Sequence, residues 1–283
     1  SKKTAAVITK NNSQRVFGAD VLSRIQAANG GYAEKLKALI WRDLVEGMDE
    51  LSEKCAGAPA IGRLVISANT TMQHLLAGDS CELLGVSPFR PVSLELRTKP
   101  AEEWWEEIPE KYAKTEVTLL PGMSAFVGAD IVAGIYGCNL YHRGKKPVLF
   151  VDLGTNGEMA LITDEGTLAS SVAAGPALEG GNISCGVPSV EGAVNSVSCM
   201  GKRIVLHTIG NKRPIGLCGT GVLETAYEIV KTGAADEGGT FCGAYQESGF
   251  LLAETSAHGT PIRFTQEDMR QLQMAKAWLY SMG

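Results

Sequence analysis

The stretch PVLFVDLGTNGEMA, residues 147–160, predicts two strands joined by a tight turn. Four consecutive apolar residues, 148–151, are typical of a strand that is buried on both faces, and a second apolar run follows the turn. Gly154 and the pair Asn156 and Gly157 tolerate positive φ, so we expect the backbone N–H groups of the turn to point into one concavity. A concavity of this kind suits an anion such as phosphate.

Three polar side chains accompany this turn. Asp152 lies at its start, where a carboxylate could hold a magnesium ion or its water ligands against a triphosphate, and Thr155 and Asn156 add a hydroxyl and an amide. The alternative is an ordinary Asn-Gly hairpin with a solvated aspartate, and an Asn-Gly pair alone would favour it. The complete pattern D-x-G-T-N-G-E after an apolar run favours a phosphate-binding loop.

This pattern resembles the second phosphate loop of the superfamily that contains actin, the sugar kinases and the heat-shock chaperone ATPases. The whole chain is similar to one branch in particular, the ATPase part of the reductive activators of corrinoid proteins. Seven segments carry the resemblance: FGADVLSRI (17–25), ANTTMQHLLAG (68–78), LPGMSAFVGADIVAG (120–134), VDLGTNGEMAL (151–161), AAGPALEGGNISCG (173–186), IGLCGTGVLE (215–224) and FTQEDMRQLQMAKA (264–277). Each segment alone is weak evidence, but seven in order are specific.

The resemblance implies an α/β fold of two actin-like lobes with ribonuclease H-like cores, residues 1–126 and 127–283. It implies ATP-dependent reductive activation of a corrinoid (cobalamin) protein, in which this chain supplies the part that binds ATP and the partner. ATP and Mg²⁺ are the implied cofactors, and ATPase activity is implied for the complete protein. Two alternatives stay open: a non-catalytic binding module of the same fold, and a small-molecule kinase of the superfamily.

The resemblance also implies roles for single residues. Asp130, near the crossing between the lobes, matches an acidic residue that orients the attacking water, unless it only caps its helix. Asp152 is the candidate for magnesium binding and catalysis. The phosphates would lie against Gly154, Thr155, Asn156 and Gly157.

Residues 173–193 form a long glycine-rich segment that holds Glu179, Asn182, Ser184 and Cys185. Ordering such a loop is entropically costly, so it is either disordered or functional, and we favour the functional interpretation. Asn182 and Ser184 are candidate partner contacts, because a short polar group on a mobile loop could reach a corrin pocket, and a hydroxyl suits a weak cobalt contact better than a thiolate does. The alternative is that Ser184 only caps a turn. Cys185 has no adjacent His or Lys and is expected to be buried or inert.

A second glycine turn, G-x-x-G-x-G at residues 216–221, precedes an expected helix that ends at Gly233. The pattern is not the dinucleotide motif G-x-G-x-x-G, so an NAD site is discounted. The start of this helix, with Gly219 and Gly221, could still meet a nucleotide phosphate or ribose.

Hydrophobic periodicity predicts further elements. Strands are expected over 4–9, 63–67, 116–120 and 167–171, a long amphipathic helix over 32–55, and a last helix with a capping box at Thr265 and Asp268. Asn69, Thr70 and Thr71 follow the strand over 63–67, which we expect to be buried. They either face a ligand cleft at the edge of the sheet, or Thr70 or Thr71 caps the next helix. Trp104 and Trp105 either form an exposed contact patch or pack ordinarily, which we favour.

Composition narrows the partners. A net charge of -5 without a block of Lys or Arg argues against a nucleic acid or an anionic membrane surface as the main partner. No apolar run approaches the ~18 residues of a membrane span, and no signal-peptide pattern is present, so a cytoplasmic protein is expected. A homodimer is expected as well.

The seven cysteines include no C-x-x-C pair, so we expect reduced thiols and no iron–sulfur cluster in this chain. The first phosphate loop and the adenosine loop of the resembling family have no counterpart here. Both ends are therefore expected to be trimmed.

Overall fold

The computed structural model describes residues 4–18, 20–55, 61–142, 144, 146–201 and 203–281. Contacts divide the chain into two compact units: the first unit is Ser1–Val148 with Leu161–Ala169, and the second unit is Leu149–Ala160 with Ser170–Gly283. Within the described ranges, no helix combines the length and the apolar character that a membrane crossing needs.

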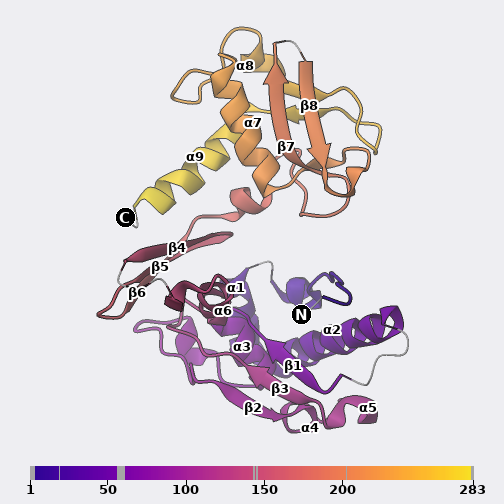
Figure 1. Cartoon of the computed structure of the whole chain (residues 1–283), viewed down its shortest axis with the longest axis vertical. Helices are drawn as coiled ribbons and strands as arrows, with labels where there is room; N and C mark the ends of the chain where they lie inside the picture. The colour runs from indigo at the N-terminus through magenta and orange to yellow at the C-terminus, as the bar shows by residue number, and fades with distance from the viewer. Residues whose placement is uncertain are drawn as a thin grey trace. The chain divides into compact units, whose positions relative to one another are not determined.

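The first unit contains a three-stranded sheet with helices beside it (Figure 1). Its strands are β1 (Arg63–Ile66), β2 (Arg97–Pro100) and β3 (Glu116–Leu119). Its helices are η1 (Ser13–Phe17), α1 (Val21–Ala27), η2 (Ala28–Tyr32), α2 (Ala33–Lys54), α3 (Thr70–Ala77), η3 (Glu82–Leu84), α4 (Ala101–Trp104), α5 (Glu110–Ala113), α6 (Ala129–Gly137) and η4 (Leu140–His142). The sheet order is β1-β3-β2, with β1 parallel and β2 antiparallel to the central β3.

Helix α2 confirms the long amphipathic helix expected over 32–55. The side chain of Trp41 in this helix is fully buried and packs with Leu76 and Val117. Its indole N–H donates to the carbonyl oxygen of Leu76 at 3.0 Å. Trp104 is 4% exposed in the same core, and Trp105 stacks on Trp41 with ring centroids 6.2 Å apart. The two neighbouring tryptophans therefore pack ordinarily, as favoured.

Two strand expectations for this unit need correction. Residues 4–9 form no strand; Lys10 pairs with Glu46 at 2.7 Å and Glu50 at 2.9 Å, which fastens the segment along α2 instead. β1 is not buried, since its residues alternate between exposed and half-buried. The reason is its position, because β1 is an edge strand of the sheet.

A second three-stranded sheet has the order β4-β5-β6. Its strands are β4 (Val148–Leu153), β5 (Asn156–Ile162) and β6 (Thr167–Ala173), so the strand expected over 167–171 is confirmed. The division into units falls within these strands, with Leu161–Ala169 assigned to the first unit.

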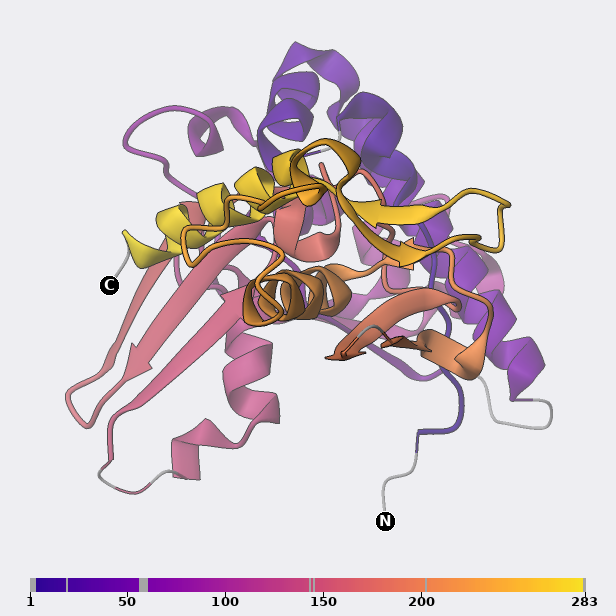
Figure 2. The same ribbon diagram turned by 90° about the horizontal axis from the view of Figure 1, so that it is seen from above.

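The remaining elements of the second unit surround one apolar core. They are η5 (Pro176–Glu179), β7 (Ala193–Met200), β8 (Arg203–Thr208), η6 (Ile209–Asn211), β9 (Gly216–Leu217), α7 (Gly219–Lys231), α8 (Tyr245–Ser248), β10 (Phe250–Ala253), β11 (Ile262–Phe264) and α9 (Gln266–Tyr280). β7 lies between β8 and β9, and β10 pairs with β11. Seen from above, α9 runs away from the β10-β11 pair (Figure 2).

Helix α9 begins with the expected capping box: the Thr265 side chain accepts from the backbone of Asp268, and the Asp268 side chain accepts from the backbone of Thr265. Met269, Leu272 and Ala275 are buried, which confirms the expected apolar face. α7 ends before Gly233, whose φ of 73° terminates the helix as predicted.

Candidate functional site

The predicted phosphate hairpin is present, and its turn is shorter than expected. The expectation of a first strand buried on both faces is wrong, because Leu149, Val151 and Leu153 of β4 are exposed. β4 continues through Asp152 to Leu153 and β5 starts at Asn156, so only Gly154 and Thr155 lie between the strands. The backbone N–H of Gly154 donates to the carbonyl oxygen of Asn156 at 3.0 Å, which closes the turn. The side chain of Asp152 is exposed at the end of β4.

The expectation of positive φ at the glycines of this turn is wrong. Gly154 has a φ outside the left-handed region, and Gly157 lies buried inside β5. Gly154 is instead a place of close approach: a Cβ there would lie 3.0 Å from Oε1 of Glu179. The two-residue turn leaves no need for left-handed backbone, but it leaves little room for a side chain.

Glu179 is the residue at this site to which sequence reasoning gave no role. It ends η5, and its Oε2 accepts the hydroxyl hydrogen of Thr155 at 2.5 Å. The N–H of Gly175 donates to the carbonyl oxygen of Thr155 at 2.9 Å, so the segment before η5 also holds the turn. A contact across 24 residues has no local sequence signal, and only the folded chain reveals it.

The oxygen atoms of this turn suit a hard cation. Asp152 and Glu179 carry exposed carboxylates and Thr155 carries a hydroxyl, which are the donor types that Mg²⁺ prefers. In the part of the chain that the structure describes, no group of three or more His, Cys, Asp or Glu side chains could hold a metal ion. A magnesium ion would therefore be held by one or two carboxylates together with phosphate oxygens and water.

The glycine-rich segment after β6 is held by close backbone contacts. A Cβ at Gly186 would lie 1.8 Å from the carbonyl oxygen of Gly180, and Gly180 itself has a φ of 81°. Ile183 is 6% exposed in the core of the second unit. Glycine is required at Gly180 and Gly186 because the two backbone stretches pack directly against each other. The side chain of Ile183, between them in sequence, anchors the segment in the core.

Ser184, a predicted partner contact, is tied to α9. Its backbone N–H donates to Oδ1 of Asp268 at 2.6 Å and its hydroxyl donates to Oδ2 at 2.7 Å. Asp268 is 1% exposed and Ser184 is exposed, so Ser184 is anchored on a buried carboxylate and is not the turn cap considered as the alternative. Asn182 is exposed with a φ of 57°. The partner role of both residues stays a prediction.

Burial in this segment raises the pKa of the Cys185 thiol to about 12, and the charge of Asp268 adds to the shift. A thiol with this pKa is almost wholly protonated at neutral pH. Cys185 is half-buried, and its raised pKa agrees with the expectation of a buried or inert thiol.

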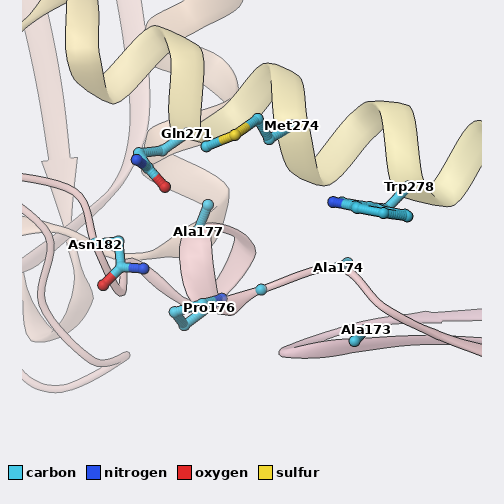
Figure 3. Close-up of a pocket in the computed structure, with 9 residues that line it drawn as sticks. Ala173, Ala174, Pro176, Ala177, Asn182, Gln271, Met274 and Trp278 are labelled. Atoms are coloured by element: carbon cyan, nitrogen blue, oxygen red, sulfur yellow. The ribbon is translucent and has the colours of Figure 1, made fainter.

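A hollow of about 260 Å³ lies beside Asn182 in the second unit. Gln271, Met274 and Trp278 of α9 face a floor made by the small residues 173–177 (Figure 3). Asn182 is the predicted site residue among the residues that line it.

Gly219 and Gly221, predicted to meet a nucleotide, are buried at the start of α7. A Cβ at Gly219 would lie 1.9 Å from the carbonyl oxygen of Leu178, and one at Gly221 would lie 2.1 Å from that of Val194. Both glycines let α7 pack closely on its neighbours. Their contact with a nucleotide stays a prediction.

In the first unit, two helices start together where the parallel strands β1 and β3 end. Asn69 caps α3, since its side chain accepts from the N–H of Met72 at 2.9 Å, and a Cβ at Gly128 would lie 2.5 Å from Cα of Asn69. Gly128 is the N-cap residue of α6, so Asp130 does not occupy the capping position, although its Oδ1 accepts from the N–H of Ile131 at 3.1 Å. Asp130 lies half-buried in the first turn of α6, and its role with water stays a prediction.

Thr70 and Thr71 do not cap α3, because Asn69 does. Both are buried, and the hydroxyl of Thr70 donates to the carbonyl oxygen of Ser124 at 2.7 Å. Neither the cleft-facing nor the capping interpretation of these two threonines is therefore correct.

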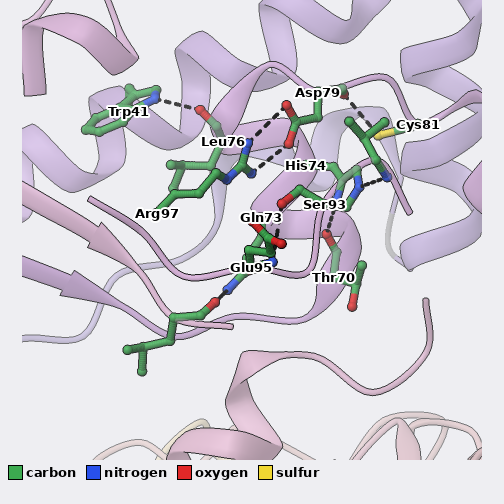
Figure 4. Close-up of polar contacts among 12 residues, drawn as sticks. Trp41, Thr70, Gln73, His74, Leu76, Asp79, Cys81, Ser93, Glu95 and Arg97 are labelled. Atoms are coloured by element: carbon green, nitrogen blue, oxygen red, sulfur yellow. Dashed lines mark hydrogen bonds and ion pairs between the residues drawn. The ribbon is translucent and has the colours of Figure 1, made fainter. Parts of the chain in front are cut away.

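The polar cluster in Figure 4 is a structural part of the first unit. His74 is fully buried: its Nε2 accepts from the N–H of Val92 at 2.9 Å, so its Nδ1–H donates to the carbonyl oxygen of Thr70 at 2.8 Å. Burial lowers the pKa of this imidazole. Arg97 binds both carboxylate oxygens of Asp79, at 3.2 and 2.6 Å. These bonds fasten the loop between α3 and β2.

Comparison with known proteins places the chain in a family. The model of the RACo middle region matches residues 1–143, and the model described as the C-terminal domain of RACo, the ASKHA domain, matches residues 146–283. A solved structure of a reductive activator for corrinoid, iron-sulfur protein superposes with a TM-score of 0.84 at 30% sequence identity, covering 96% of this chain and 45% of that chain.

Two curated relatives are similar in sequence. The corrinoid activation enzyme RamQ of Eubacterium limosum is 31% identical over 296 residues, which cover 95% of this chain and 48% of the relative. The [Co(II) methylated amine-specific corrinoid protein] reductase of Methanosarcina barkeri is 34% identical over 143 residues, 50% of this chain and 25% of the relative. The chain thus spans about half, or less, of the length of these proteins.

The ASKHA match confirms the α/β, actin-like fold class and implies a nucleotide-binding domain. The hairpin with Asp152 and Thr155 lies inside the residues of that match. The chain belongs to the RACo family, as a middle region followed by the C-terminal ASKHA domain.

Proposed function

We propose that this chain binds ATP and takes part in the reductive activation of a corrinoid protein. The observation that carries the proposal is the hairpin: a D-x-G-T-N-G-E sequence folds as two strands with a two-residue turn inside the ASKHA domain. The names of the relatives support the corrinoid protein as the partner. Nucleotide binding or hydrolysis would change the grip on that partner.

In this proposal each predicted site residue has one task. Asp152 holds Mg²⁺, Asp130 orients the attacking water, and the functional lobes divide near Phe126. The nucleotide lies against Gly154, Thr155, Asn156, Gly157, Gly219 and Gly221. When bound, Mg²⁺ neutralises phosphate charge, and the residues of this chain position the phosphates around it.

The partner would be met through Asn182 and Ser184, beside the hollow in the second unit. The anchoring of Ser184 on Asp268 would hold this segment in a defined shape for that contact. A homodimer and a cytoplasmic location belong to the same proposal.

Two measurements on the full-length protein test the proposal. ATP titration with and without Mg²⁺ should show saturable binding, and the visible spectrum of a cobalt(II) corrinoid protein should shift when the protein is added. Partner binding without any nucleotide binding would contradict the proposal and favour a non-catalytic module. Absence of both would remove it altogether.

The partner role of Ser184 has its own test. The spectral shift and the rate of reactivation are compared between the parent and Ser184→Ala, with melting temperatures recorded for both. We expect the variant to fold and to give a smaller shift. The same shift and the same rate in both proteins would leave Ser184 with the structural role alone.

A further inference from the structure

We infer that Glu179 is a positioning residue for the phosphate turn. Its carboxylate accepts the hydrogen bond from the hydroxyl of Thr155. That hydroxyl then has no hydrogen to donate to a phosphate, so the turn would hold phosphate through a divalent cation. This inference rests on the proposed function and deepens it.

The geometry places one carboxylate against both residues of the turn. Oε2 of Glu179 lies 2.5 Å from the hydroxyl oxygen of Thr155, and Oε1 lies 3.0 Å from the place where a Cβ of Gly154 would be. All three residues belong to the second unit, so the contact is internal to one compact body.

The hydroxyl chemistry follows from this contact. A threonine hydroxyl has one hydrogen to donate and two lone pairs. A carboxylate is a stronger hydrogen-bond acceptor than a neutral oxygen, so the hydroxyl hydrogen of Thr155 is donated to Glu179. The oxygen of Thr155 then presents lone pairs to a ligand. Lone pairs repel a phosphate oxygen, but they can bind Mg²⁺ or a water molecule that Mg²⁺ holds.

The charge of Glu179 acts in the same direction. A carboxylate beside the turn raises the electrostatic cost of placing a triphosphate there, and a divalent cation between the two groups removes that cost. Asp152, at the end of β4, adds a second carboxylate just before the turn. Free nucleotide should therefore be disfavoured relative to its magnesium complex.

The backbone that carries Glu179 is held in place, although its side chain is exposed. Ala177 and Leu178 are 3% and 9% exposed in the core of the second unit, and the carbonyl of Leu178 packs against Gly219. Gly180, with a φ of 81°, ends η5 and donates its N–H to the carbonyl oxygen of Ala177 at 3.1 Å. A fixed backbone at this position keeps the carboxylate within reach of the turn.

The test compares ATP affinity in Mg²⁺ and in EDTA for three full-length proteins: the parent, Glu179→Gln and Thr155→Val. Glu179→Gln keeps the size and an acceptor oxygen but removes the charge, and Thr155→Val removes the hydroxyl. Glu237→Gln, an exposed glutamate after α7, is the matched control. Melting temperatures show which variants fold, and either of the two site variants is sufficient for the test.

For the parent we expect Mg²⁺ to tighten ATP binding by about tenfold or more, and the control should keep this ratio. In Glu179→Gln the ratio should fall to about threefold or less, mainly through tighter binding in EDTA. In Thr155→Val it should fall through weaker binding in Mg²⁺. A merely structural role of Glu179 would lower the melting temperature without changing the ratio.

An unchanged ratio in a folded site variant would overturn the inference, as would a parent that binds ATP equally in Mg²⁺ and in EDTA. In those cases the proposal that this chain binds ATP would stand, because ATP still binds, although equal binding in Mg²⁺ and EDTA would remove the proposed role of Asp152 with Mg²⁺. A parent that binds ATP under neither condition would overturn both the proposed function and the role of Glu179.

Discussion

The second unit uses glycine for different reasons in the turn after β4 and in two other places, the segment after β6 and the start of α7. In the turn after β4, the nearest obstacle to a side chain at Gly154 is the carboxylate end of Glu179, at 3.0 Å. In the segment after β6 and at the start of α7, the obstacles are backbone carbonyls, at 1.8 Å for Gly186, 1.9 Å for Gly219 and 2.1 Å for Gly221. A flexible side-chain end can move aside, but a packed backbone cannot.

The difference teaches where glycine indicates a ligand and where it indicates packing. The glycine-rich segment, the more conspicuous of the two in sequence, is held by its own backbone and by Asp268. Beside the hairpin turn, the carboxylates of Asp152 and Glu179 are exposed, so these oxygen donors can meet a ligand. Four predictions follow from this contrast, from the largest effect to the smallest.

Gly219→Ala should cause the largest loss of stability, because the added methyl group would overlap the carbonyl of Leu178 and force η5 and α7 apart. We expect the free energy of unfolding to fall by about 3 kcal/mol. Urea unfolding measures it. Gly137→Ala, at the end of α6 where a Cβ meets nothing within 4 Å, is the control and should lose nothing. Equal stability of the two variants would contradict the packing role.

Asp268→Ala should come next, since this carboxylate accepts from Ser184 and from Thr265 and is buried. Removing it breaks the capping box of α9 and leaves donors unpaired, so we expect a loss of about 2–3 kcal/mol. Ser184→Ala removes one hydroxyl bond and keeps the backbone bond, and should lose only about 1 kcal/mol. Thermal unfolding of the two variants measures these losses. If Ser184→Ala loses as much stability as Asp268→Ala, Asp268 is not the main anchor of this segment.

Asp152→Ala probes the hairpin itself. Because this side chain is exposed, the free energy of unfolding should stay within about 0.5 kcal/mol of the parent. ATP affinity in Mg²⁺ should fall by about tenfold or more, with little change in EDTA. Calorimetric titration of the full-length protein measures the two affinities, and urea unfolding measures the stability. Unchanged affinity for Mg-ATP would remove the phosphate-loop assignment.

Gly154→Ala should have only a small effect on stability, under about 1 kcal/mol and well below that of Gly219→Ala, because its φ is outside the left-handed region and the carboxylate of Glu179 can withdraw. Withdrawal would lengthen the contact with Thr155, so the advantage of Mg²⁺ in ATP binding should shrink as well. A loss of stability as large as that of Gly219→Ala would show that the turn is packed as tightly as the glycine-rich segment. That outcome would end the comparison.

The sequence by itself determined the elements whose signal is local. The 3.6-residue periodicity predicted α2 and the buried face of α9, and the capping box at Thr265 predicted where α9 begins. Two apolar runs around glycines predicted the hairpin, with its strands a few residues too short. Seven ordered motifs placed the chain in its family. Each of these signals lies within one short stretch, where neighbouring residues decide backbone geometry.

Only the tertiary structure decided how distant residues meet. β7 begins at Ala193, the last residue of the glycine-rich segment, and it forms a strand because β8 and β9 pair with it. Ser184 finds Asp268 across 84 residues, and Thr155 finds Glu179 across 24. No local pattern encodes such contacts, because hydrogen bonds and close backbone packing depend on where the completed fold carries each residue.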